Sequence, residues 1–183
     1  MAAGLVGHFV AMARNNAWAN HRLLSACEVL TPEEFAAPRT SFFPSLRATF
    51  NHILLVDLYY IEALEGLDAL RLYSQPKPDF ADARTMRQAQ TASDQRLIAF
   101  CERQTEDSLQ QDCVLPRPDR RPPPSRVAAV LEHLFQHQIH HRGQAHAMLA
   151  GTRIKPPQLD EFFLAGEEPL RRDELRALGL PEA

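Results

Sequence analysis

The sequence predicts an all-α protein, a four-helix bundle with a short C-terminal extension, in a single domain that covers residues 1–183. Apolar residues recur every three or four positions along four long stretches, which is the pattern of amphipathic helices. The 183 residues include only seven glycines, whereas the helix formers Ala, Leu, Arg and Glu are abundant. Proline-rich segments separate the long stretches. Helices of this kind bury their apolar faces against one another, which favours a bundle.

The first long helix is expected at residues 3–30. Asn16 and Asn20 lie on the same stripe as the apolar residues of this helix, and a buried amide needs polar partners. We therefore expect both to form hydrogen bonds between helices, in preference to a catalytic role. Trp18 faces the other way, and an outward tryptophan is typical of an interface, such as the contact of a homodimer. The apolar stripe itself consists of Leu5, Phe9, Met12, Leu23, Cys27 and Leu30.

The rest of the chain divides into helices and breakers. Residues 31–34, Thr-Pro-Glu-Glu, have the sequence of a helix start with a capping box. Ser125 is a suitable cap for the last long helix, and Phe42 and Phe43 are expected to pack at the base of a loop. Further helices are expected at residues 45–73, 82–108 and 125–151, and a short charged helix at 169–178. A loop at 39–44 and proline-containing connectors at 74–80 and 111–124 separate them. The segment 159–164 is expected to pack over one end of the bundle.

Five of the eight histidines lie in residues 131–148, within the last long helix. His137 and His141 are one turn apart and share the apolar stripe, so both imidazoles should point into the bundle. His133 lies at the edge of this stripe, whereas His140 and His146 point away from it. Two inward imidazoles one turn apart can bind a metal, and they can also be buried histidines that form hydrogen bonds across the bundle. The residues alone leave both interpretations open.

The helix at 45–73 supplies a third histidine, His52, at the edge of its apolar arc. Facing helices of a bundle commonly build metal sites together, so His52, His137 and His141 form a candidate ligand set. Three protein ligands leave coordination positions open to water or substrate, which is typical of a reactive metal. Asp57 lies within the apolar arc, where a carboxylate needs a partner. It could orient a ligand histidine or pair with an arginine or the two asparagines, and both roles remain open.

Composition limits the classes of function. The net charge is −3, which gives no case for a nucleic-acid partner. No apolar run approaches the ~20 residues that span a bilayer, and residues 1–10 lack the features of a signal peptide. Three widely spaced cysteines, Cys27, Cys101 and Cys113, indicate reduced thiols and a cytoplasmic location.

One short basic segment interrupts this acidic composition. The connector at 111–124 carries Arg117, Arg120 and Arg121. Such a loop could dock an anionic group of a substrate. A solvated loop without a binding role is the favoured interpretation.

The last long helix contains the pattern HxxxHxGQ, and a further histidine, His52, lies upstream. Other characteristic segments occur in order along the chain. Together the segments are Trp18-Ala19-Asn20-His21-Arg22-Leu23-Leu24, Ser41-Phe42-Phe43-Pro44-Ser45-Leu46, Asn51-His52 with Asp57, His137-Gln138-Ile139-His140-His141-Arg142-Gly143-Gln144 and Pro156-Pro157-Gln158-Leu159-Asp160. In these segments the chain resembles the DinB/YfiT-like superfamily of metal-dependent bundle proteins, and the histidine pattern with the upstream histidine carries most of the resemblance.

The resemblance implies an up-down-down-up bundle, often dimeric, with one divalent transition metal per chain. The metal would be held by His52, His137 and His141, with zinc or nickel favoured and iron as a further candidate. His133 is an extra histidine that could support the ligands through hydrogen bonds. Relatives include thiol S-transferases and isomerases that use low-molecular-weight thiols such as bacillithiol or mycothiol.

Three functions follow as hypotheses. The first is an enzyme of the thiol S-transferase or hydrolase type, in which the metal activates a thiol or water for a small-molecule substrate. Asp57, Asn20 or Gln144 would then orient the ligands. The alternative is a non-catalytic, stress-related metal-binding protein. A DNA-associated protein is disfavoured, because the chain is acidic and has no sustained basic stripe.

Overall fold

The computed structural model describes residues 4–181, and it confirms the prediction of an all-α protein. The long helices are α1 (Leu5–Cys27), α3 (Leu46–Leu64), α5 (Ala83–Glu102) and α6 (Val127–Ala150). The shorter elements are α2 (Pro32–Ala36), α4 (Arg71–Ser74), η1 (Ser108–Gln110), β1 (Asp112–Cys113), β2 (Ser125–Arg126), η2 (Ala165–Glu167) and α7 (Glu168–Ala177). The predicted helix start at residue 3 lies outside the described residues.

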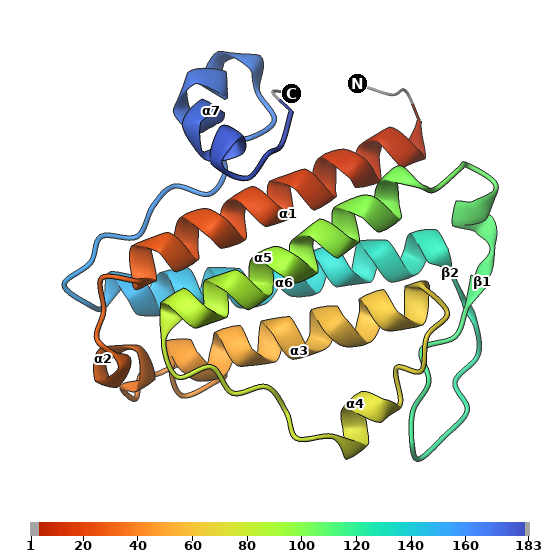
Figure 1. The fold of residues 1–183 in the computed structure, drawn as a ribbon, viewed down its shortest axis with the longest axis horizontal. Helices are drawn as coiled ribbons and strands as arrows, with labels where there is room; N and C mark the ends of the chain where they lie inside the picture. The colour runs from red at the N-terminus through yellow and green to blue at the C-terminus, as the bar shows by residue number, and fades with distance from the viewer. Residues whose placement is uncertain (1–3, 182–183) are drawn as a thin grey trace.

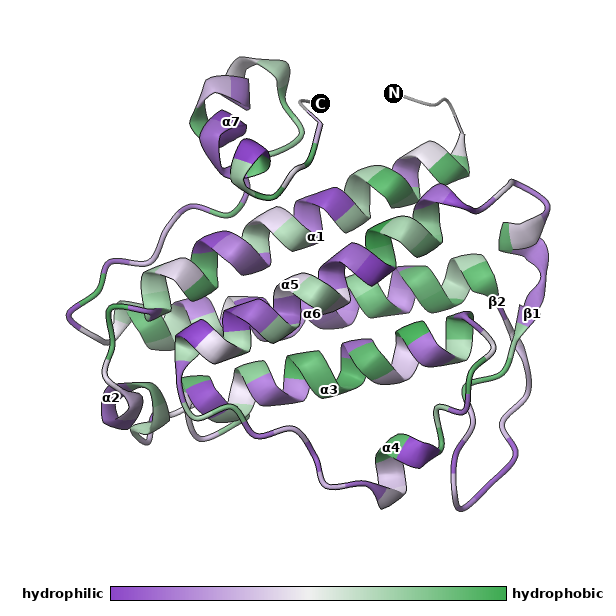
Figure 2. Ribbon diagram, in the orientation of Figure 1, coloured by the Kyte–Doolittle hydropathy of each residue, from purple (hydrophilic) through white to green (hydrophobic). Residues whose placement is uncertain are grey.

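The long helices pack side by side. Helix α1 contacts α5 and α6, and α3 contacts the same two helices from the other side. Figure 1 shows that α1 and α6 run in one direction and α3 and α5 in the opposite direction. Polar and apolar residues alternate around each long helix in Figure 2, as expected where one face of a helix is buried.

The core has apolar layers at both ends of the bundle and a polar layer between them. One apolar cluster joins the start of α1 to the end of α3, with Phe9, Tyr60 and Phe135 among its members. The other joins the end of α1 to the start of α3, with Leu24 and Phe50 among its members. The buried polar residues of the middle layer are Asn16, Asn20, Asp57, Gln90, Asp94, Gln138 and Arg142.

Helix starts follow the sequence signals in most cases. Thr31 and Glu34 form the predicted capping box at α2, and Ser45 and Asp82 cap α3 and α5. The prediction that Ser125 caps the last long helix is wrong. Ser125 pairs with Cys113 in the two-stranded sheet β1–β2, so the helix begins two residues later without a side-chain cap.

Two predicted helices are shorter than expected. Helix α3 ends at Leu64, not near residue 73, because Gly66 takes a left-handed conformation with φ of 71°. The backbone N–H of Gly66 donates to the carbonyl of Ala63, and the backbone N–H of Leu67 donates to the carbonyl of Glu62. These two bonds are the Schellman arrangement of a helix end. Helix α5 ends at Glu102, six residues before the predicted end at 108.

The C-terminal extension packs along the side of α1, as Figure 1 shows for α7. The prediction that Trp18 faces outward to another subunit is wrong, since Trp18 is 0% exposed beneath this extension. Its ring lies 5.7 Å from that of Phe162, and its Nε1 donates to Glu174 at 2.7 Å. The segment 159–164 therefore covers the flank of α1 and not one end of the bundle.

No helix within residues 4–181 is both long and apolar enough to cross a bilayer.

Candidate metal centre

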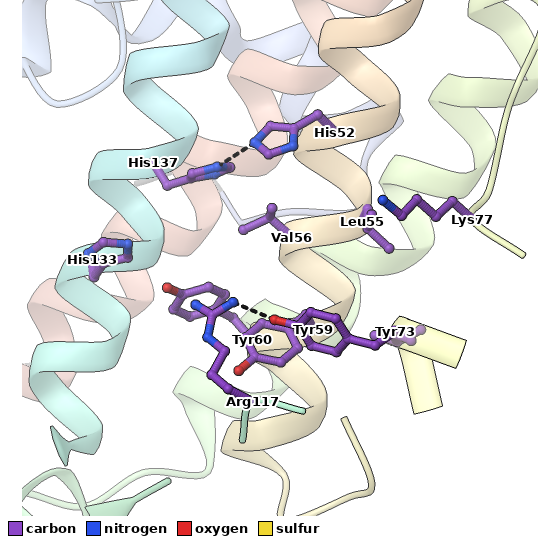
Figure 3. Close-up of a pocket in the computed structure, with 11 residues that line it drawn as sticks. His52, Leu55, Val56, Tyr59, Tyr60, Tyr73, Lys77, Arg117, His133 and His137 are labelled. Carbon is purple, nitrogen blue, oxygen red and sulfur yellow. Dashed lines mark hydrogen bonds between the residues drawn. The ribbon is translucent and has the colours of Figure 1, made fainter. Parts of the chain in front are cut away.

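The three histidines of the predicted ligand set converge between α3 and α6. Each of His52, His137 and His141 offers a ring nitrogen that lies within 4.8 Å of those of the other two. The Nε2 atoms of His52 and His137 are 3.0 Å apart (Figure 3). Two nitrogens bound to one ion at a tetrahedral angle would be about 3.4 Å apart. The spacing of the rings therefore fits a shared metal ion with small adjustments.

Gln144 determines which nitrogen of His141 is available. Its Oε1 lies 2.9 Å from His141 Nδ1, and its Nε2 lies 3.0 Å from the Nε2 of His140. The amide nitrogen must donate, so the amide oxygen accepts the Nδ1 hydrogen of His141. This arrangement leaves Nε2 of His141 free as a ligand atom. The geometry thus gives Gln144 the orienting position proposed from the sequence.

All three imidazoles are neutral at pH 7. Burial, followed by the charge of neighbouring His141, lowers the pKa of His52 to about 4. The same two causes, together with the charges of further histidines, lower the pKa of His137 to about 3. Burial also lowers the pKa of His141. Metal ions bind neutral imidazole, so the cluster is in the protonation state that coordination requires.

Phe42 and Phe43 cover one side of the histidine cluster. The ring of Phe43 lies 4.3 Å from that of His52 and 5.5 Å from that of His141. The ring centre of Phe42 lies 6.1 Å from that of His141, although the Phe42 side chain is 76% exposed. From sequence, both phenylalanines are expected only to pack at the base of a loop. Their role as an aromatic wall beside the histidines depends on a loop conformation that helical spacing does not report.

A pocket of about 410 Å³ opens on the other side of the cluster. His52 and His137 form one end of it, and tyrosines with Arg117 form the other end (Figure 3). The lining residues are His52, Leu55, Val56, Tyr59, Tyr60, Leu72, Tyr73, Lys77, Arg117, His133 and His137. Two of the three candidate ligands, His52 and His137, are thus accessible to a small molecule.

His133 lies in the wall of this pocket. Its ring stacks on Tyr60 with the centroids 5.5 Å apart and the planes at 9°. Within residues 4–181 it forms no hydrogen bond to a ligand histidine. The Nδ1 atom of His137 is buried and has no hydrogen-bond partner in this part of the chain. Packing and the contact of its Nε2 with His52 therefore set the orientation of the His137 ring.

Asn20 and Asp57 lie in the polar layer and not against the histidines. Asp94 accepts hydrogen bonds from the side-chain amides of Asn16 at 3.1 Å and Asn20 at 3.0 Å, which confirms that the two asparagines bond between helices. Arg142 donates to the amide oxygens of the same asparagines at 2.6 and 2.9 Å. The layer joins α1 to α5 and α6.

Gln90 extends this layer to α3. Its Nε2 donates to Asp57 Oδ2 at 2.7 Å and to Asp94 Oδ1 at 3.1 Å. Asp57 forms no hydrogen bond to a histidine among the described residues. Of the two roles considered for Asp57, the contacts favour the structural one.

Three neutral histidines on facing helices point toward one position at the end of an open pocket. This arrangement defines a class of helical-bundle proteins with a candidate metal centre. Comparison with known proteins narrows this class: the model of the DinB family matches residues 5–172, and the chain belongs to that family. Protein DinB of Bacillus subtilis (strain 168) is 29% identical over 139 residues, which are 73% of this chain and 80% of that relative.

Proposed function

We propose that this protein is a metal-dependent enzyme of the thiol S-transferase or hydrolase type. His52, His137 and His141 would hold one divalent transition metal per chain in an up-down-down-up bundle. The observation that carries the proposal is the opening of the histidine cluster onto a pocket of about 410 Å³. A purely structural metal site is closed by protein ligands, whereas a catalytic one keeps a position open.

The chain's own residues supply the conditions for such chemistry. His52, His137 and His141 would hold a divalent metal that, when bound, would lower the pKa of a thiol or water and supply a nucleophile near neutral pH. The three imidazoles remain neutral, and Gln144 holds the ring of His141 with Nε2 free. Phe43 keeps solvent away from one side of the cluster. A substrate would approach through the pocket on the other side.

The finer assignments rest on ligand chemistry and on the family. Three histidine ligands suit zinc or nickel, and iron is a further candidate. A low-molecular-weight thiol is the proposed co-substrate, and a homodimer the proposed assembly. Trp18 cannot form the dimer contact, because the extension of the same chain buries it.

Elemental analysis of protein purified without an affinity metal tests the centre. We expect close to one metal per chain in the wild type and none in His137→Ala. His146→Ala is the matched control, because His146 lies on the same helix but contacts the carbonyl of Pro157 at 2.9 Å. Equal metal content in the two variants would overturn the ligand assignment.

A thiol-dependence assay then separates the enzyme from the non-catalytic alternative. The metal-loaded protein is incubated with low-molecular-weight thiols and with a panel of electrophiles, esters and amides. Turnover in the wild type that is lost in His137→Ala supports the enzyme. A metal-loaded protein that is inert toward the whole panel, and that only loses melting temperature when the metal is removed, supports the alternative.

A further inference from the structure

The pocket beside the histidines has a cation at its far end. Arg117 comes from the proline-rich connector, and its guanidinium lies beside the tyrosines, away from His52 and His137 (Figure 3). Between the two ends, Leu55 and Val56 form an apolar wall. A molecule in this pocket would therefore contact the histidine nitrogens at one end, an apolar surface in the middle and a positive charge at the other end.

Contacts from three directions hold Arg117 in this position. Tyr59 donates a hydrogen bond to the carbonyl of Pro116 at 2.6 Å, which anchors the connector next to the pocket. The Cζ atom of Arg117 lies 5.1 Å from the centre of the Tyr59 ring, and Nη1 donates to the hydroxyl of Tyr73. Arg120 and Arg121 of the same connector are exposed, as expected for a solvated loop. Arg117 differs from them because it is half-buried and lines the pocket.

The charge of Arg117 is not neutralised by the protein. The lining residues include a second cation, Lys77, and no aspartate or glutamate. No carboxylate of residues 4–181 forms an ion pair with either cation. The remaining N–H groups of the Arg117 fork have no protein acceptor in the same part of the chain. A partly buried, unpaired guanidinium is a ready partner for an oxyanion of a ligand.

We infer that the pocket binds a small organic oxyanion, a carboxylate or a phosphate on an apolar body, and that Arg117 is the residue that selects for its charge. The interpretation of this pocket as a substrate subsite rests on the proposed function. His52 and Tyr60 are eight residues apart on α3, which corresponds to about 12 Å along the helix axis. The ligand would place its anionic group at Arg117 and its reactive group at the histidines.

Calorimetric titration with three compounds of one apolar body tests this inference. The probes are 4-phenylbutyrate, 3-phenylpropylphosphonate and the neutral 4-phenylbutanamide, each titrated into metal-free and metal-loaded protein. We expect at least one anion to bind to both forms and the amide to bind at least about tenfold more weakly, since a hydrogen bond to a charged group contributes that much. Comparison of the carboxylate with the phosphonate identifies the class of anion.

Three variants, at two arginines of the same connector, provide the matched comparison. Arg117→Gln is expected to weaken binding of the anion by at least about tenfold and to leave binding of the amide unchanged. Arg117→Lys, which keeps the charge and loses the fork, should give an intermediate loss. Arg120→Gln should bind like the wild type. Circular dichroism and melting temperature establish that each variant is folded.

The inference is overturned if the anions bind no more tightly than the amide, if no probe binds, or if Arg117→Gln and Arg120→Gln lose equal affinity. This test of the Arg117 subsite does not depend on whether the histidines bind a metal. Metal-free wild-type protein should keep the Arg117-dependent binding of the anion. A metal-loaded, active enzyme in which Arg117→Gln changes nothing would leave the proposed function standing and remove only this subsite.

Discussion

Replacement of Asp57 by Asn, with Asp94→Asn in parallel, tests which of two buried carboxyls holds a proton. Asp94 accepts hydrogen bonds from the amides of Asn16, Asn20 and Gln90. Asp57 accepts one from Gln90, and its Oδ1 is buried with no donor among the described residues. Burial and the charge of Asp94 raise the pKa of Asp57 to about 8, and burial raises that of Asp94 to about 7. We therefore assign the proton to Asp57.

The expected magnitude follows from proton linkage. In the unfolded chain Asp57 ionises near pH 4, whereas in the fold it keeps its proton up to about pH 8. The folded state binds more protons across this window, so its free energy of unfolding falls as the pH rises, by at most about 6 kcal/mol. Asn is neutral at every pH. The free energy of unfolding of Asp57→Asn should thus exceed that of the wild type by about 1–3 kcal/mol at pH 8, and by less at pH 5.

Asp94→Asn should have the opposite effect. Its new amide would replace an anionic acceptor and face three amide donors, at a cost of about 2–4 kcal/mol. The measurement is urea unfolding followed by circular dichroism at pH 5 and pH 8, with a chelator present. The histidines of low pKa also destabilise the folded state as the pH falls below 6.5, but their contribution cancels in the difference between variant and wild type. If Asp57→Asn loses stability at pH 8 and Asp94→Asn does not, the proton assignment is wrong.

Three further predictions concern the extension and the metal centre. Phe162→Ala should lower the free energy of unfolding by about 3 kcal/mol and shift Trp18 fluorescence to longer wavelength, because Phe162 is 3% exposed and contacts that ring. Phe163→Ala, at an exposed neighbour, should change neither quantity. Gln144→Ala should weaken metal binding by about 10–100-fold in a chelator competition, since it frees the ring of His141, and an unchanged affinity would remove its orienting role. Metal affinity should fall most steeply between pH 5 and pH 3, where His52 and His137 take up protons with pKa values of about 4 and about 3; a fall centred on pH 6.5 would contradict the burial of these two ligands.

Helical periodicity was sufficient to predict the long helices and the common direction of His137 and His141. His137 and His141 are one turn apart on a stripe that must face the core, so their common direction follows from spacing alone. The end of α3 carried a signal as well, in Gly66, but apolar residues beyond it continued the helical pattern. Local spacing therefore predicts which face is buried better than it predicts where a helix stops.

Helical spacing could not predict contacts between segments that are distant in the sequence. Trp18 lies opposite the core face of α1, and only the path of residues 159–178 shows that the same chain buries it. Arg117 resembles its exposed neighbour Arg120 in sequence, and the bond from Tyr59 to Pro116 is what brings it to the pocket. Both cases depend on irregular chain whose direction no periodic pattern specifies.

The polar layer and the histidine cluster are linked through helix rotation. On α6 the layer residue Arg142 directly follows His141, so the two side chains point about 100° apart. The bonds of Arg142 to Asn16 and Asn20 therefore fix the direction of His141 relative to α1. Apolar packing alone tolerates several rotations of a helix, whereas buried polar groups are satisfied in few of them. We therefore expect the polar layer, although costly to bury, to select the rotation of α6 at which its imidazoles meet the one from α3.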